Sequence, residues 1–167
     1  MADELTIRID DAAVVAMFAR LRGVRDLSPL MADIGEAVLE STQQRFVTST
    51  APDGSKWKPL ADGSGRKPLL KSGTMRDEIA PRSGRDFAEL IATRRQARWH
   101  QEGTPPYTIT AKPGSALHWP GAAHPVPKVE HPGLPARQFM GVSAADVQTI
   151  GALGEAFLDG LAQGRQR

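Results

Sequence analysis

Residues 117–143 read LHWPGAAHPVPKVEHPGLPARQFMGVS and largely decide how this chain can fold. The overlapping segment 112–135 holds six of the chain's 13 prolines. Proline fixes φ and removes a backbone N–H donor, so this segment cannot form a long helix or the inner strand of a sheet. We therefore expect residues 112–135 to form an extended arm.

The arm is expected to be anchored where it ends, at Ala136-Arg137-Gln138-Phe139. We expect Phe139 to insert into an apolar surface and Arg137 to pair with a carboxylate. Ser143 and Asp146 then have the spacing of a capping box, which predicts a final helix. Its expected apolar side consists of Val147, Ile150, Leu153, Phe157 and Leu161.

Working outward toward the N-terminus, alternating and helical apolar patterns predict the remaining elements. Ser28 is expected to cap a long helix, with Pro29 at its first position. The turn residues 83–86 and 112–115 each predict a β-hairpin. The predicted strands are residues 5–9, 79–83, 87–93, 107–111 and 116–119, and the further predicted helices are residues 11–22, 28–47 and 96–102.

These elements predict an α+β fold: an antiparallel sheet of about four to five strands, packed by two or three helices, with long extended loops and arms. The length of 167 residues suits one domain covering residues 1–167. Residues 49–72 are predicted to be a long loop, and a loop of that length is usually functional. The Pro-rich arm at 112–135 is the second irregular feature.

Composition excludes several classes of protein. No apolar run approaches the roughly 20 residues that a membrane-spanning helix needs. The first residues, MADELTIRID, are acidic and have no apolar core, so we expect no secretion signal. The chain has no cysteine, which excludes disulfides and thiolate metal sites and suits a reducing cytoplasm.

Charge is distributed unevenly along the chain. Residues 1–50 hold five Lys or Arg against eight Asp or Glu, whereas residues 51–140 hold 14 against eight. The basic excess therefore lies in the loop-rich middle. It either forms an ordinary mixed surface or meets nucleic acid or an acidic protein face.

No pattern of catalytic residues is recognisable. The four histidines, at positions 100, 118, 124 and 131, lack the HxxxH and HxH spacings of metal sites. A nucleophile elbow and a P-loop are also missing. We therefore predict no catalytic, cofactor-binding or metal-binding residue and expect that the protein is not an enzyme.

Four groups of residues stand out when taken in order: Phe46 with Pro52-Asp53-Gly54, Trp57 and Pro59-Leu60; residues 70–79; His100-Gln101-Glu102-Gly103-Thr104; and residues 136–143. These motifs resemble those of phage virion morphogenesis proteins of the Mu-like tail completion type. Two positions depart from the family pattern: Glu102 stands where an aromatic residue is usual, and Gln138 where proline is usual. The residues of Ala111-Lys112 through Leu117, with His131-Pro132-Gly133, also resemble related neck and tail-component proteins of long-tailed phages.

The resemblance implies a structural virion protein at the phage neck or tail top, assembled in the host cytoplasm. Such a protein would act in tail completion and head–tail joining as the subunit of a ring, with six copies in the virion. Expected partners are further copies, other neck, tail-terminator or tail-tube proteins, and passing genomic DNA without sequence specificity; we expect no membrane contact. The predicted interface residues are Trp57, Arg66, Lys67, His118, Trp119, His131, Arg137 and Phe139.

Two alternatives remain open. The first is a sequence-independent nucleic-acid-binding accessory protein that uses the basic middle segment, namely Arg94, Arg95, Arg98, Lys56, Lys58, Arg66 and Lys67. The second is a metal-dependent hydrolase in which His118, His124 and His131 converge.

Overall fold

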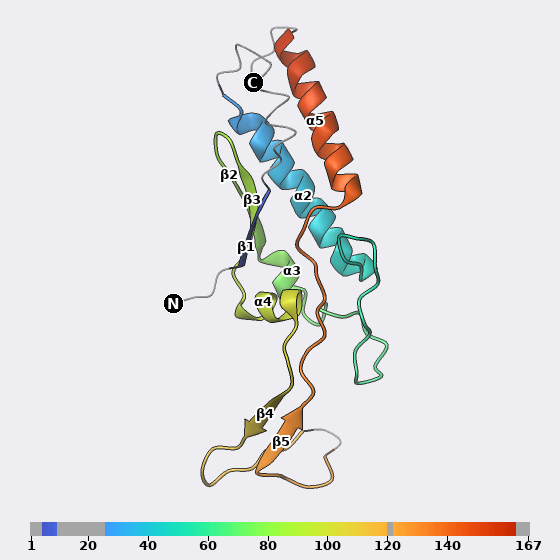
Figure 1. Cartoon of the computed structure of the whole chain (residues 1–167), viewed down its shortest axis with the longest axis vertical. Helices are drawn as coiled ribbons and strands as arrows, with labels where there is room; N and C mark the ends of the chain where they lie inside the picture. Colours follow the sequence, from blue (N-terminus) through green and yellow to red (C-terminus); the bar gives the residue numbers. More distant parts are fainter. Residues whose placement is uncertain (1–4, 10–25, 120–121, 163–167) are drawn as a thin grey trace.

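The computed structural model describes residues 5–9, 26–119 and 122–162. A body of helices and one small sheet continues into a two-stranded ribbon that projects from one end (Figure 1). The helix expected at residues 11–22 lies outside the described residues. The α+β class is confirmed.

The sheet of the body has three antiparallel strands in the order β1-β3-β2. They are β1 (Leu5–Ile9), β2 (Ile79–Ser83) and β3 (Ala88–Ala92). As expected from its apolar residues on both faces, β3 is the central strand and is almost entirely buried. Pro81 lies in the edge strand β2, where a missing N–H donor is tolerated.

Helix α2 (Ser28–Thr48) covers the sheet with the side chains of Leu30, Ile34 and Val38. Its start differs from the prediction, because Leu27 rather than Ser28 occupies the cap position. The Asp26 carboxylate accepts the N–H of Ser28 at 2.9 Å instead. An aspartate two residues upstream therefore supplies the acceptor that the first helical turn needs.

Helix α5 (Ala144–Ala162) lies beside α2 (Figure 1). The capping box that starts it is confirmed: the N–H of Ser143 donates to Asp146 Oδ2 at 2.7 Å, and the N–H of Asp146 donates to Ser143 Oγ at 3.1 Å. Ile150 is buried against the core, as expected. Val147 is half exposed, so its predicted place on the apolar side is wrong.

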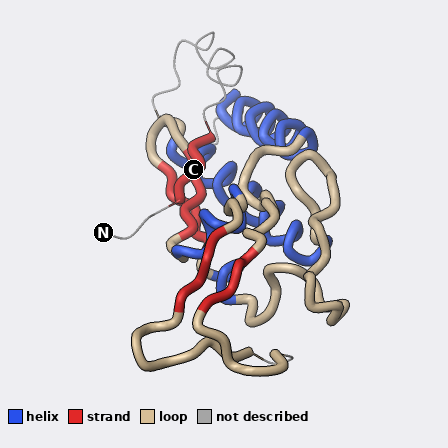
Figure 2. The backbone as a smooth tube through the Cα atoms, turned by 60° about the horizontal axis from the view of Figure 1, so that its bottom comes forward, coloured by secondary structure: helices blue, strands red, loops and turns tan. Residues whose placement is uncertain are grey.

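Two short helices, α3 (Thr74–Asp77) and α4 (Arg95–Glu102), close the end of the body from which the ribbon leaves (Figure 1). The ribbon pairs β4 (Tyr107–Thr110) with β5 (Lys128–His131) as a separate antiparallel sheet. Figure 2 shows these two strands running apart from the three strands of the body. The main sheet therefore has fewer strands than the four to five expected.

The ribbon also corrects the second predicted hairpin. The turn at 112–115 forms, with the N–H of Ser115 donating to the carbonyl of Lys112 at 3.0 Å. However, β4 pairs with β5 and not with residues 116–119, of which only Leu117 makes a bridge, to Val126. The non-local register places Ile109 opposite Val129. A local turn pattern predicts the turn but carries no information about this distant partner.

Candidate functional site

After β5 the chain returns to the body through residues 136–143, which we call the returning segment. Three aromatic side chains form the centre of the region where this segment joins the body. Phe46 of α2 lies edge-on to Trp57 of the 49–72 loop, with ring centroids 5.6 Å apart. Phe139 lies 5.1 Å from Phe46 on another side. All three are buried, so they tie a helix, a loop and the segment after the arm into one core.

The Pro52-Asp53-Gly54 turn explains how Trp57 reaches this position. The N–H of Gly54 donates to the carbonyl of Ala51, and the N–H of Trp57 donates back to the carbonyl of Ser49 at 2.9 Å. The chain thus reverses within a few residues of α2. The indole Nε1 then donates to the carbonyl of Gln138 at 2.8 Å.

Gln101 of α4 holds the same segment from another side. Its Oε1 accepts the N–H groups of Phe139 and Met140, both at 3.0 Å, and its Nε2 donates to the carbonyl of Met140 at 2.8 Å. The N–H of Arg137 adds a bond to the carbonyl of His100 at 2.7 Å. A single side chain therefore satisfies backbone groups that would otherwise be buried without partners.

Arg45 joins α2, the returning segment and α5. It donates to the carbonyls of Phe139 at 2.9 Å and Gly141 at 2.7 Å, and it forms a buried ion pair with Asp146. Burial lowers the pKa of Arg45, although Asp146 opposes that shift. Burial alone would raise the pKa of Asp146, but hydrogen bonds from Ser41 and Ser143 together with the charge of Arg45 lower it overall.

Arg137 contacts the long loop and not a carboxylate, which corrects the expected ion pair. Its Nε donates to the carbonyl of Lys58 at 2.9 Å, and its Nη2 donates to that of Pro59 at 3.1 Å. Burial lowers the pKa of Arg137. The guanidinium therefore binds the 49–72 loop to the segment that returns from the arm.

The two chain segments that connect the ribbon to the body lie close together at Thr104 and Leu134. The N–H of Thr104 donates to the carbonyl of Leu134 at 2.9 Å, and the N–H of Leu134 donates to Thr104 Oγ1 at 2.9 Å. Gly133 has a φ of +87°, and a Cβ there would lie 2.2 Å from the carbonyl oxygen of Thr104. Only glycine allows these two segments to approach this closely.

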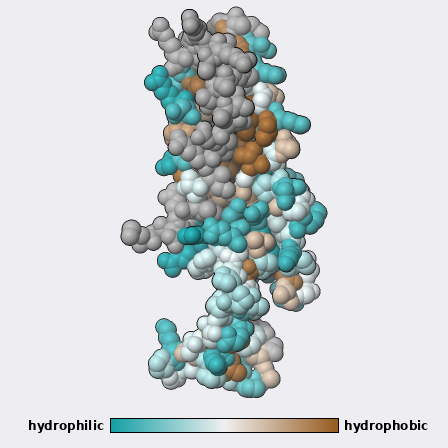
Figure 3. Space-filling model, viewed as in Figure 1, coloured by the Kyte–Doolittle hydropathy of each residue, from teal (hydrophilic) through white to brown (hydrophobic). Residues whose placement is uncertain are grey.

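We call the assembly of Arg45, Phe46, Trp57, Gln101, Arg137, Phe139 and Asp146 the junction. Beyond it, the ribbon has little interior. Tyr107 and His131 stack with ring centroids 4.7 Å apart, yet Tyr107 is 45% exposed and Trp119 43% exposed. Figure 3 shows the ribbon connected to the body by a narrow waist. The junction thus fixes the base of a projection whose own surface is largely free.

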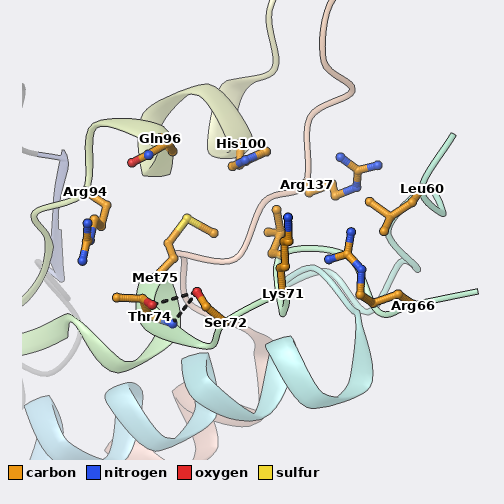
Figure 4. A pocket seen from close by; sticks show the side chains of 11 residues that line it. Leu60, Arg66, Lys71, Ser72, Thr74, Met75, Arg94, Gln96, His100 and Arg137 are labelled. Atoms are coloured by element: carbon orange, nitrogen blue, oxygen red, sulfur yellow. Dashed lines mark hydrogen bonds between the residues drawn. The ribbon is translucent and has the colours of Figure 1, made fainter. Parts of the chain in front are cut away.

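A pocket of about 420 Å³ opens beside the junction, between the long loop, α3 and α4 (Figure 4). The side chains of Arg66, Lys71, Arg94, His100 and Arg137 line it, whereas no aspartate or glutamate of the described residues does. Burial lowers the pKa of His100, and the nearby charge of Arg137 lowers it further. The pocket is therefore electropositive even with His100 neutral.

The eight predicted interface residues fall into two groups. Trp57, Arg137 and Phe139 are buried within the subunit and belong to the junction. The other five lie on the outside: Arg66, Lys67, His118 and Trp119 are exposed, and His131 is partly exposed in the ribbon. Within the described ranges, no three His, Asp, Glu or Cys residues are grouped so that they could hold a metal ion.

Sequence reasoning missed Arg45 and Gln101 as members of the junction. A signal for Arg45 was present, because it lies beside Phe46 on the helix face that also carries Val38 and Thr42. A charged residue on a buried face needs a partner, and that partner is Asp146. Gln101 belongs to one of the motifs above, but its role depends on a contact with residues 38 and 39 positions away.

No helix among the described residues has the length and apolar character needed to span a bilayer. Comparison with curated proteins and with solved structures gave no significant match. The profile of the phage virion morphogenesis family matches residues 9–159, which include every element described above from α2 to β5 and most of α5. The chain therefore belongs to the phage virion morphogenesis family and has its role in building the phage particle.

Proposed function

We propose that this protein is a structural subunit at the phage neck or tail top and acts in tail completion and head–tail joining. Copies form a ring about the tail axis, six in the virion, and contact neck, tail-terminator or tail-tube proteins. The protein carries out no catalysis in this role. The observation that supports the proposal is a projecting ribbon whose base is fixed by a buried junction.

The ribbon has the properties of a segment that is completed by a neighbour. A two-stranded ribbon without a core is marginally stable alone. Exposed aromatic side chains such as Tyr107 and Trp119 are enriched at protein interfaces, because a ring buries much apolar area at little entropic cost. In a ring, each ribbon would reach a different surface of the next copy.

The proposal is tested with phage that lack the gene. Electron microscopy should show full heads and separate tails, or tails that lack their head-proximal end, and the infectious titre should fall to background. Supplying the intact gene from a plasmid should restore joined particles. Complete, infectious particles in its absence would contradict the proposal.

Sequence-independent DNA binding is the second candidate, and the basic pocket favours it. Against it, most of the cations named for that role have partners within the chain. Arg94 pairs with Glu78 and Arg98 with Glu102, while Lys56 and Lys67 donate to backbone carbonyls of α2. A titration with duplex DNA at two salt concentrations decides: tight binding that weakens steeply with salt would favour this candidate.

A further inference from the structure

The charge of Arg137 has no carboxylate partner among the described residues. The residue is 5% exposed, and within the described part of the chain its guanidinium donates to two backbone carbonyls. A buried charge without a counter-charge is unfavourable, and an anion placed nearby would relieve that cost. A negative group supplied from outside the subunit would therefore stabilise the charge of Arg137.

The pocket beside Arg137 is shaped to receive such a group. Figure 4 shows Lys71 and Arg66 extending from the long loop toward His100 and Arg137. Lys71 has no ion pair within the described part of the chain, and Arg66 has only an exposed one, 3.7 Å from Asp62. The Nδ1 of His100 is buried and has no hydrogen-bond partner among the described residues. These groups would suit a carboxylate.

A matching acidic surface lies on the outer side of α2. Asp33, Glu36 and Glu40 are exposed and follow one another at spacings of three and four residues, so they share one helix face. None of the three forms an ion pair with a described residue. We call them the acidic stripe.

We propose that the pocket docks the carboxylates of the acidic stripe from a second copy of this chain. This inference rests on the proposed ring, because each copy then offers one pocket and one stripe, and repeated head-to-tail contacts form a ring when the rotation between copies closes. A pocket fits projecting side chains, whereas a DNA backbone would need an exposed track of free cations. The contact would also supply the counter-charge that Arg137 lacks.

Cross-linking in purified particles tests this contact, and the absence of cysteine from the chain keeps the background low. A variant with both Glu36→Cys and Lys71→Cys, treated with a bis-maleimide, should give a ladder of covalent oligomers. Each single-cysteine variant should give none beyond a dimer. The matched control is Glu155→Cys with Lys71→Cys. It moves the first cysteine to an exposed acidic position on α5 and should give no ladder.

Charge reversal gives a second measurement. Two double variants each reverse the charge of one surface: Glu36→Lys with Glu40→Lys, and Arg66→Glu with Lys71→Glu. Each should lower the yield of infectious particles about 10-fold or more, because like charges then face each other. All four changes in one chain again place opposite charges at these four positions and should raise the yield above that of either double variant, although Arg137 stays positive and keeps the recovery partial. Circular dichroism of each variant checks that these exposed substitutions leave the fold intact.

The outcomes separate this inference from the proposed function. Particles that contain the chain but give no cross-link between positions 36 and 71 would overturn the docking contact and leave the structural role standing. Particles that never contain the chain would overturn the structural role itself. Loss of DNA affinity on Arg66→Glu with Lys71→Glu, together with no ladder from the Glu36→Cys/Lys71→Cys variant, would assign the pocket to DNA and overturn the inference.

Discussion

The junction and the ribbon lie next to each other in the chain, yet they are built in opposite ways. In the junction, Phe46 and Phe139 are fully buried, and the backbone of the segment around them is bonded by side chains from α2, α4 and the long loop. In the ribbon, the strands β4 and β5 bond each other, and the ring of Tyr107 remains half exposed.

This difference distinguishes the part of the structure that is stable in the free subunit from the part that we expect assembly into the particle to stabilise. Backbone groups near the junction have internal partners, so the base of the ribbon has a defined direction before assembly. The ribbon has few apolar contacts of its own and belongs to the low-stability part of the molecule. Substitutions in the two regions should therefore differ in their effects on stability and on assembly.

Phe139→Ala should have the largest effect. Removing a fully buried aromatic ring leaves a cavity beside Phe46, and such a change costs about 4 kcal/mol of unfolding free energy. Urea denaturation followed by tryptophan fluorescence measures it. Trp119→Ala removes an aromatic ring from the exposed part of the arm and should change the unfolding free energy by less than about 1 kcal/mol. Equal losses would abolish the distinction between the regions.

Asp146→Ala should cost about 3 kcal/mol, because it leaves the buried charge of Arg45 without its carboxylate. Folding lowers the pKa of Asp146 from the ordinary value of 3.8. The carboxylate therefore contributes its full share of the unfolding free energy above that pH, and this share is lost as the pH falls through the folded-state pKa. Wild-type unfolding free energy should therefore fall below about pH 4. Asp146→Asn, which cannot ionise, should show a flatter acid limb; an unchanged limb would contradict this assignment.

Gly133→Ala should cost about 2 kcal/mol, because it combines a left-handed φ with a collision against the backbone of Thr104. Gly114 is a matched control: its φ is +77°, but a Cβ there meets nothing within 4 Å. Gly114→Ala should therefore cost only about 1 kcal/mol. Limited proteolysis should show faster cleavage in the arm for Gly133→Ala alone. Similar cleavage in both variants would mean that the two connecting segments are not tightly packed.

Tyr107→Ala should have the smallest effect on stability, about 0.5 kcal/mol, because it removes only a stacked and half-exposed ring. Its effect should appear instead in the particle, as a lower yield of joined heads and tails. Thermal unfolding and infectious titre, measured on one variant, separate these two quantities. A large loss of stability with normal titre would place Tyr107 in the fold and not at a contact.

Local signals predicted much of the fold. The β2–β3 hairpin, the central position of β3 and the capping box at Ser143 each depend on residues close together in sequence. The start of α2 was displaced by one residue because the Asp26 carboxylate competes for the free N–H of Ser28. The pairing of β4 was wrong because β5 lies beyond the nearest turn and its register follows from contacts made in the folded chain.

The sequence motifs identified the segments that form the junction, but they did not indicate which contacts their residues make within the subunit. Phe139 was expected to insert into an apolar surface, and it does so against Phe46. Arg137 was expected to meet a carboxylate, but the nearest acceptors are carbonyls of the long loop, which no sequence pattern places beside it. The electropositive pocket likewise arises from residues 60–137, which are brought together only by folding.

Hydrogen exchange, measured on the full chain both free and within purified particles, shows whether the junction is complete in the free subunit and whether assembly completes the ribbon. In the free protein, the amides of Phe139 and Met140 should exchange slowly, while those of β4 and β5 exchange much faster. In particles, the ribbon amides should become protected, and the junction should change little. Equal protection of ribbon and junction in the free protein, or a ribbon that stays unprotected in the particle, would show that assembly does not complete the ribbon.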